Sequence, residues 1–294
     1  MTTLAFDIGG TKIRAGLVVA DRVWDVKDIP TAVGEGETSI VPSIIRLAQT
    51  YAGMERIAVA AAGVVNGGVV TSATDLIPGW AGTDLAGELR EALGLPVGVL
   101  GDVHAHGVGE AAHGAAKGHH TSLTVAVGTG IGGGYVEGLR PVTGAHGVAG
   151  HVGHVTHGAA AGLPCSCGRT GHLEPLASGE GLRSLYERAT GDRISGRELD
   201  RRAEQGDEVA IEALETGGRA LGEVLGSLAN TLDPGIIIVS GSVSRSRAFW
   251  WPAVTEGYNS SAMDPVRETS LVRGTLGDAA PLIGAAVYAK EAHV

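Results

Sequence analysis

Two stretches of the chain share one pattern of hydrophobic and polar positions. In LAFDIGGTKIRAGLVV (residues 4–19) and LTVAVGTGIGGGYVEG (residues 123–138), an apolar run leads into a turn rich in glycine and threonine, and an alternating run follows. Alternation with a period of two is typical of strands, and glycine-rich turns join strands into hairpins. The repeat indicates an internal duplication and predicts two related lobes that face a shared cleft.

Apolar positions recur at helical spacing around these hairpins. They predict amphipathic helices over residues 83–94, 207–230 and 284–292. Short apolar runs bounded by turn residues predict buried strands within residues 56–65, 96–102 and 233–244. Strands that alternate with helices predict an α/β protein.

Composition narrows the classes of function that the chain can serve. Of its 294 residues, 44% are hydrophobic and 18% are charged, which is typical of a globular protein, and the formal net charge is −10. An acidic chain matches nucleic acid poorly, because neutralising phosphates requires Lys and Arg. No basic leader precedes Leu4, and no apolar run is long enough to span a bilayer. We therefore expect a cytoplasmic protein with neither a nucleic-acid nor a membrane partner.

The first turn, DIGGTK at residues 7–12, has residue types that bind phosphate. Its two glycines let backbone N–H groups approach an anion closely, Thr11 adds a hydroxyl and Lys12 adds positive charge. Asp7, at the end of the preceding strand, could hold Mg²⁺ through water. An ordinary β-hairpin explains this turn equally well when it is taken alone.

The second turn, GTGIGGG at residues 128–134, repeats these features. Two hairpins of one design, both dense in glycine, are harder to explain by turn geometry alone. The pair predicts a nucleotide whose phosphates are held between the two lobes. The first turn does not match the GxxxxGK[ST] pattern, so a P-loop fold is not indicated.

Asp102 is the candidate for acid–base chemistry. It follows the strand predicted within residues 96–102, and open α/β sheets usually bind ligands at the carboxyl edge of their strands. A carboxylate at that edge could accept the proton of a substrate hydroxyl. The same position also suits an aspartate that caps the N-terminus of a helix, and position alone favours the cap.

Cysteines and histidines cluster within residues 151–174, which include the stretch GHVTHGAAAGLPCSCGRTGHLE (residues 153–174). Four ligands for tetrahedral Zn²⁺ are available there: Cys165, Cys167, His172 and one upstream histidine. Spacing leaves three candidates for that histidine: His151, His154 and His157. A closed Cys₂His₂ site is structural, so the ion would stiffen a loop and take no part in catalysis. The other interpretation is a pair of free buried thiols.

Six segments occur in the order found in the ROK family of sugar kinases and repressors: DIGGTK, GTGIGGG, AGHVGH, CSCGRTGHLE, NTLDPGIIIVSGSVS and GDAAPLIGAA. The resemblance covers essentially the whole chain and implies an actin-like (ribonuclease H-like) ATPase fold of two lobes with a catalytic cleft between them. The implied lobes are a small one over residues 1–105, closed by a C-terminal helix at about 281–294, and a larger one over residues 106–280 that contains the zinc loop. Members of the family usually form homodimers and phosphorylate a hexose with ATP and Mg²⁺.

The resemblance also assigns roles to individual residues. Asp102 matches the catalytic base, which takes the proton of the sugar 6-hydroxyl while its oxygen attacks the γ-phosphate. His154 matches a histidine that both ligates zinc and contacts a sugar hydroxyl. The zinc set is then His154, Cys165, Cys167 and His172. Positions that match the sugar site are Gly63, Asp75, His151, His154 and Glu174. Positions that match the ATP site are Asp7, Gly9, Gly10, Thr11, Lys12, Gly128, Thr129, Gly130, Gly132 and Gly241.

Three departures from the family pattern bear on the substrate and the metal. His151 stands where the family usually has glutamate, and this substitution resembles the N-acetylmannosamine kinases of the family. Gly101 stands where asparagine usually precedes the catalytic aspartate, and His172 replaces a zinc cysteine. The expected activity is phosphorylation of N-acetylmannosamine, and the alternative is a glucokinase or N-acetylglucosamine kinase of the same fold. His157 falls outside the motif and is expected to be a solvated loop residue.

Two other classes of protein share parts of this pattern. The sugar-sensing repressors of the family carry a winged helix-turn-helix ahead of the DIGGT element, where only three residues precede Leu4 here. A sugar-binding protein without activity would agree with Gly101. The presence of Asp102 and of both glycine turns disfavours that second class.

Overall fold

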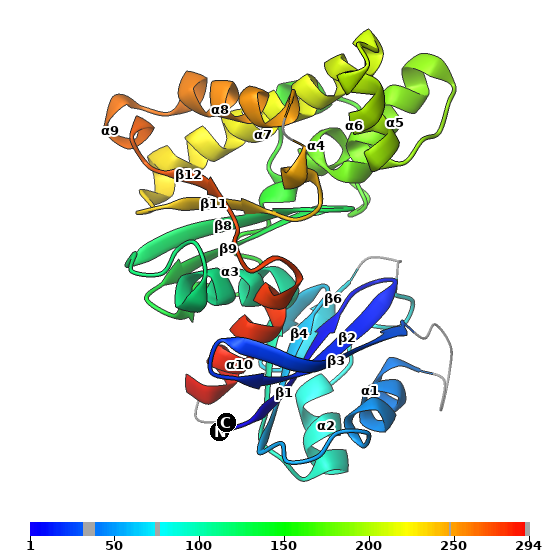
Figure 1. The fold of residues 1–294 in the computed structure, drawn as a ribbon, viewed down its shortest axis with the longest axis vertical. Coiled ribbons are helices and arrows are strands. Elements are labelled where there is room, and N and C mark those ends of the chain that lie inside the picture. The colour runs from blue at the N-terminus through cyan, green and yellow to red at the C-terminus, as the bar shows by residue number, and fades with distance from the viewer. Residues whose placement is uncertain (32–38, 74–76, 247, 292–294) are drawn as a thin grey trace. The chain divides into compact units, whose positions relative to one another are not determined.

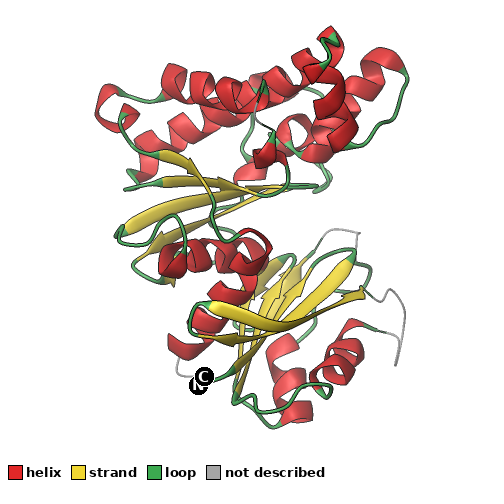
Figure 2. Ribbon diagram, in the orientation of Figure 1, coloured by secondary structure: helices red, strands yellow, loops and turns green. Residues whose placement is uncertain are grey.

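The computed structural model describes residues 1–31, 39–73, 77–246 and 248–291, and Figure 1 draws the chain as a ribbon. The chain forms two compact units. Unit 1 comprises Met1–His120, Gly134–Gly150 and Thr275–Val294, and unit 2 comprises Thr121–Gly133 and His151–Gly274. Two five-stranded sheets with helices packed on them confirm the predicted α/β class (Figure 2).

Unit 1 is built on a sheet with the strand order β3-β2-β1-β4-β7. The strands are β1 (Thr3–Ile8), β2 (Lys12–Val19), β3 (Arg22–Pro30), β4 (Arg56–Ala61) and β7 (Val97–Gly101). β1 and β2 form the first predicted hairpin, whereas β1, β4 and β7 run parallel. The carboxyl ends of these three parallel strands therefore meet at one edge of the sheet. A short hairpin of β5 (Val64–Asn66) and β6 (Val69–Ser72) follows β4.

The two faces of this sheet differ in side-chain size. The large apolar side chains of β1, such as Phe6, belong to a buried cluster with α1 (Ile40–Ala48) and α2 (Leu85–Leu93). Alternate positions hold small residues, and α10 (Ala280–Glu291) packs against them. At Gly98 a Cβ would lie only 2.6 Å from the Cβ of Ala289. The alternation of large and small residues thus determines how closely a helix can approach each face.

Helix α3 (Asp102–His113) belongs wholly to unit 1, whereas the predicted lobe boundary at residue 105 would divide it. It packs on α10, and glycines bring the two backbones together: a Cβ on Gly284 or on Gly109 would overlap a carbonyl oxygen of the partner helix. Residues 134–150 and 275–280 also fall in unit 1 rather than in the implied second lobe. The contact with α10 ties α3 to the N-terminal sheet, which keeps that helix whole within unit 1.

The second sheet has the strand order β10-β9-β8-β11-β12. Its strands are β8 (Thr121–Val127), β9 (Ile131–Glu137), β10 (Arg140–Pro141), β11 (Ile237–Ser240) and β12 (Leu271–Arg273). β8 and β9 are neighbours and confirm the second predicted hairpin. β11 is parallel to both β8 and β12.

The helices of unit 2 include one long pair with closely approaching backbones. The helices are α4 (Glu174–Ala177), α5 (Gly179–Thr190), α6 (Gly196–Glu204), α7 (Glu208–Leu232), α8 (Trp250–Ser261) and α9 (Asp264–Arg267). Gly218, Gly222 and Gly226 on α7 are spaced four residues apart and face α8. A Cβ on Gly218 would lie 2.6 Å from the carbonyl oxygen of Trp250, and one on Gly226 would lie 2.7 Å from that of Tyr258. This row of glycines lets the two helices pack along their length.

The three predicted helices are confirmed, with shifted ends. The segments 83–94 and 207–230 correspond to α2 and α7, and α10 begins at Ala280 rather than at residue 284. Pro281 explains the earlier start, since proline is tolerated in the first turn of a helix. Within the described parts of the chain, none of the helices combines the length and the hydrophobicity needed to cross a bilayer.

Candidate functional site

Three residues predicted to contact substrates lie at one edge of the unit 1 sheet. Asp7 is near the end of β1, Gly63 follows β4, and Asp102 follows β7 directly as the first residue of α3. Because these strands are parallel, the three positions share the carboxyl edge of the sheet. Gly63 has a φ of +100°, and a Cβ there would lie 2.5 Å from the carbonyl oxygen of Ser72, so this position requires glycine.

Asp102 holds its proton far more tightly than an ordinary aspartate. Burial raises its pKa from 3.8 to about 7, and the negative charge of Asp7 contributes to the rise. The N–H of Val103 donates to Oδ1 of Asp102 at 2.8 Å and opposes the shift, because it stabilises the ionised form. Gly101 occupies the N-cap position of α3, so Asp102 is not the helix cap. A carboxyl group with a pKa near neutrality is suited to proton transfer at physiological pH.

Asp7 lies beside a network of charges on the first hairpin. In the antiparallel register it is paired with Arg14, which donates to Asp28 at 2.8 and 2.9 Å and to Asp278 at 2.9 Å. Burial raises the pKa of Asp7 to about 6, although Arg14 and Lys12 lower it. Sequence reasoning missed Arg14, because its partner Asp278 is distant in the chain.

The imidazole of His104 lies beside Gly101, the position where the family usually has asparagine. Gly101 is buried, and a Cβ there would lie 3.1 Å from Nδ1 of His104, so the imidazole fills the space beside it. Nε2 of His104 donates to the carbonyl oxygen of Ala149 at 2.7 Å. Burial lowers the pKa of His104, which favours a neutral ring. Sequence reasoning missed His104, because its contact with residue 149 depends on the fold.

The second glycine turn lies at the corresponding edge of the unit 2 strands. The N–H of Gly128 donates to the carbonyl oxygen of Gly130 at 2.9 Å, as the N–H of Gly9 donates to that of Lys12 at 3.0 Å in the first turn. Gly241 follows β11, which is parallel to β8. Its φ is +86° and a Cβ would overlap the carbonyl oxygen of Val127, so this loop also requires glycine.

Glu174 joins the second turn to the cysteine and histidine loop. It is the first residue of α4, and its Oε2 accepts a hydrogen bond from the N–H of Ile131 at 3.0 Å. Its Oε1 accepts from the hydroxyl of Ser166 at 2.6 Å. Each carboxylate oxygen has a further lone pair that a sugar hydroxyl could use. Sequence reasoning missed Ser166, which no motif singles out.

The structure brings four predicted metal ligands together. The ligand atoms of His154, Cys165, Cys167 and His172 all lie within 4.8 Å of one another. The two histidine Nδ1 atoms are 3.3 Å apart. Sγ of Cys165 lies 3.5 Å from Nδ1 of His154, and Sγ of Cys167 lies 3.3 Å from Nδ1 of His172. A tetrahedral zinc ion with Zn–N bonds of about 2.05 Å separates two nitrogens by about 3.3 Å. The residues therefore fit a four-coordinate zinc site, and the histidine of the set is His154.

The orientation of His154 agrees with a second role beside the metal set. Its Nδ1 faces the cluster, which leaves Nε2 on the far side of the ring. The ring of His151 stacks near it, with centroids 6.2 Å apart and an interplanar angle of 19°. His151 is outside the metal cluster and lies next to the imidazole that is expected to contact sugar.

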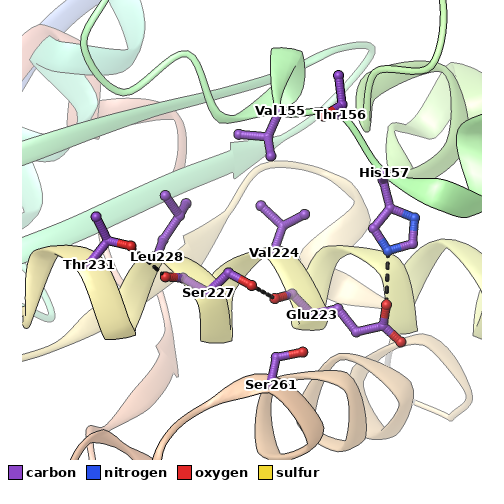
Figure 3. Close-up of a pocket in the computed structure, with 9 residues that line it drawn as sticks. All are labelled: Val155, Thr156, His157, Glu223, Val224, Ser227, Leu228, Thr231 and Ser261. Carbon is purple, nitrogen blue, oxygen red and sulfur yellow. Dashed lines mark hydrogen bonds and ion pairs between the residues drawn. The ribbon is translucent and has the colours of Figure 1, made fainter.

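His157 is not the solvated loop residue expected from the sequence. Its side chain is only 16% exposed, and its Nε2 lies 2.8 Å from Oε2 of Glu223 on α7. Figure 3 shows this pair in a pocket of about 270 Å³ whose other lining residues come from the segment after His154 and from α7 and α8. None of the predicted site residues is among the described residues that line this pocket.

The predicted residues thus form two separate sets. Unit 1 holds Asp7, Gly9, Gly10, Thr11, Lys12, Gly63 and Asp102. Unit 2 holds Gly128, Thr129, Gly130, Gly132, His151, His154, Cys165, Cys167, His172, Glu174 and Gly241. Asp75 lies outside the described residues.

Known proteins match this chain over nearly its whole length. The sequence model of the ROK family matches residues 3–292. The N-acetylmannosamine kinase of Escherichia coli (strain K12) is 32% identical over 295 residues, which cover 99% of each chain. The solved structure of the ROK hexokinase from Thermus thermophilus matches with a TM-score of 0.86 and 32% identity, over 99% of this chain and 98% of that one.

A second solved structure bears on nucleotide and sugar binding. It is a ROK family glucokinase from Streptomyces griseus in complex with glucose and AMPPNP. It matches with a TM-score of 0.85 and 30% identity, over 99% of this chain and 100% of that one. These neighbours have the two-lobed actin-like ATPase fold, so the predicted fold is confirmed.

Proposed function

The chain belongs to the ROK family, and on that premise we propose that it is an ATP-dependent kinase that phosphorylates the 6-hydroxyl of N-acetylmannosamine. The observation that carries the proposal is the position of Asp102. It is a carboxyl group with a pKa of about 7 at the edge of the sheet where α/β proteins bind ligands. The similarity to sugar kinases over the whole chain supports the same activity.

In the proposed reaction Asp102 is the general base. Its carboxylate accepts the proton of the sugar 6-hydroxyl while the hydroxyl oxygen attacks the γ-phosphorus of ATP in line. A new O–P bond forms, the bond from phosphorus to the bridging oxygen breaks, and ADP leaves with that electron pair. Burial and Asp7 make the Asp102 carboxylate basic enough for this transfer near neutral pH.

The two glycine turns suit the polyphosphate of ATP. The N–H groups of Gly9 and Gly128 close the two turns, and the backbone at Gly10, Thr11, Thr129 and Gly130 can approach an anion without bulky side chains. Thr11 and Lys12 are exposed. Asp7 is the residue that would hold Mg²⁺ through water, because a nearby cation offsets the burial that raises its pKa. When bound, Mg²⁺ neutralises the charge that develops on the phosphate oxygens.

The cysteine and histidine cluster is proposed to hold a structural Zn²⁺. His154, Cys165, Cys167 and His172 would fill all four positions of a tetrahedral ion and would leave none for a reacting water. An ion at Nδ1 of His154 would fix the proton on Nε2 and make that nitrogen a donor to a sugar hydroxyl. Homodimer formation stays a prediction from the family resemblance, and a cytoplasmic location stays a prediction from the sequence.

His151 supports N-acetylmannosamine over glucose. The relatives alone do not choose the sugar, because the N-acetylmannosamine kinase and the hexokinase are each 32% identical to this chain. His151 stands where a carboxylate is usual, and an imidazole can donate a hydrogen bond that a carboxylate cannot. Its stacking on His154 puts this change beside the proposed sugar contact.

A sugar panel tests the substrate. With ADP release as the readout, kcat/KM should be at least about tenfold higher for N-acetylmannosamine than for N-acetylglucosamine or glucose. His151→Glu should move the ratio toward glucose by about tenfold, because it replaces a donor with an acceptor. A wild-type preference for glucose or N-acetylglucosamine would favour the alternative activity, and no turnover of any sugar would refute the kinase assignment.

The pH dependence tests Asp102. A general base must be ionised, so kcat/KM should rise with pH through the Asp102 pKa of about 7 and fall about tenfold per pH unit below it. Exposed Asp21 is a matched control, and Asp21→Asn should leave the profile unchanged. A profile that is flat between about pH 6 and 8, about one unit either side of half-ionisation, would contradict the assignment.

A further inference from the structure

Ser166 lies between the two cysteines of the proposed metal site. Its hydroxyl donates to Oε1 of Glu174 at 2.6 Å, which is short for such a bond and typical of a charged acceptor. Ser166 is exposed and contributes no ligand atom to the cysteine and histidine cluster. Its short hydrogen bond is to a carboxylate on a different element, the first turn of α4, whereas Sγ of Cys165 lies 4.0 Å from the hydroxyl oxygen.

The other oxygen of that carboxylate is bound to the second glycine turn. Oε2 of Glu174 accepts from the N–H of Ile131, the first residue of β9, at 3.0 Å. Gly130 makes this contact possible, because a Cβ there would lie 2.6 Å from Oε2. The absence of a side chain at position 130 thus serves a protein contact as well as any approach to phosphate.

The opposite side of the same turn is held by α5. The N–H of Gly179 donates to the carbonyl oxygen of Gly128 at 2.8 Å, and the N–H of Glu180 donates to that of Thr129 at 3.4 Å. The turn therefore has two supports, the start of α5 on one side and Glu174 on the other. Of these two supports, Glu174 is the one whose side chain also bonds to the cysteine and histidine loop, at Ser166.

We propose that Ser166 is a positioning residue that holds Glu174 against Ile131, so that the cysteine and histidine loop and the second glycine turn move as one body. The role in nucleotide binding rests on the proposed function, whereas the mechanical link does not. Through this link, a metal site whose ligand positions are all taken by protein would still be connected to the second glycine turn. It also predicts that loss of the metal loosens the turn through Ser166 and Glu174.

The test compares Ser166→Ala with Thr170→Ala, which removes an exposed hydroxyl from the same loop. Amide hydrogen exchange at Ile131, read by NMR, should accelerate about tenfold in Ser166→Ala and stay unchanged in Thr170→Ala. Ser166→Thr should restore slow exchange, because it keeps the hydroxyl. Zinc content by elemental analysis should be the same in all these variants, which separates the effect from loss of the metal.

Kinetics extend the test to function. Ser166→Ala should raise KM for ATP about fivefold with a smaller change in KM for the sugar, because the turn it supports faces phosphate. Unchanged exchange at Ile131 in Ser166→Ala would overturn the proposal. Faster exchange in a protein without kinase activity would keep the link and refute the proposed function, so the two failures are distinguishable.

Discussion

Asp102→Asn is expected to lower kcat by about 10³-fold or more. A general base contributes about 10²- to 10⁴-fold to a proton-transfer step, and asparagine cannot accept the proton. The substitution keeps the size of the side chain and the oxygen that accepts from Val103. Binding of sugar and ATP, measured by calorimetry, should therefore persist. Near-wild-type turnover would remove Asp102 from the mechanism.

The same variant should be more stable than the wild type at alkaline pH. The folded-state pKa of Asp102 is about 7 and its ordinary value is 3.8, so the folded protein binds the proton more tightly than the unfolded chain. This group's effect on stability is then most favourable at low pH and is lost as pH rises through 7. The advantage of Asp102→Asn in unfolding free energy grows by about 1.4 kcal/mol for each pH unit between pH 5 and the pKa near 7, so it should grow by about 3 kcal/mol between pH 5 and 8.

Urea unfolding at the two pH values measures this difference. Asp21→Asn serves as the control, because Asp21 is exposed and removal of its charge should leave the pH dependence as it is. Loss of activity together with a gain in stability is the pattern of a functional carboxylate held in an unfavourable environment. A variant that loses activity and stability together would instead indicate that Asp102 supports the fold.

Removal of zinc is expected to have the second large effect. Free zinc at about a thousandfold its dissociation constant stabilises a protein by about 4 kcal/mol, and a strong chelator should abolish that contribution. Cys165→Ser should lower the zinc content by elemental analysis and the melting temperature by calorimetry, because one thiolate ligand is lost. A wild-type protein that contains no zinc after purification in zinc-supplemented medium would contradict the metal assignment.

Three histidine variants give this experiment its matched controls. His151, His154 and His157 are spaced three residues apart, and only His154 lies in the cluster. His154→Gln should lose zinc, whereas His151→Gln and His157→Gln should retain it. Retention of zinc by His154→Gln would show that the fourth ligand is wrongly assigned.

The course of the chain was predictable from local patterns. Alternation of apolar residues identifies the two hairpins because side chains on neighbouring strand positions point to opposite faces. Helical spacing identifies α2, α7 and α10, since each helix buries one stripe. The boundary between the units was not predictable from these patterns. It depends on packing, because α3 contacts α10, and α10 packs on the sheet of unit 1.

The candidate site also combines features that local sequence predicts with features that depend on the fold. The sequence by itself determined which residue types are present for phosphate, proton and metal chemistry, because glycine turns, a carboxylate after a strand and a Cys-x-Cys pair are local features. Spacing alone did not choose His154; the family resemblance indicated it. The fold agrees, because it directs His157 to Glu223, 66 residues away, and leaves His154 3.3 Å from His172. The pKa of Asp102 and the link from Ser166 to Ile131 likewise depend on the fold. Burial and long-range contacts exist only once distant segments have packed together.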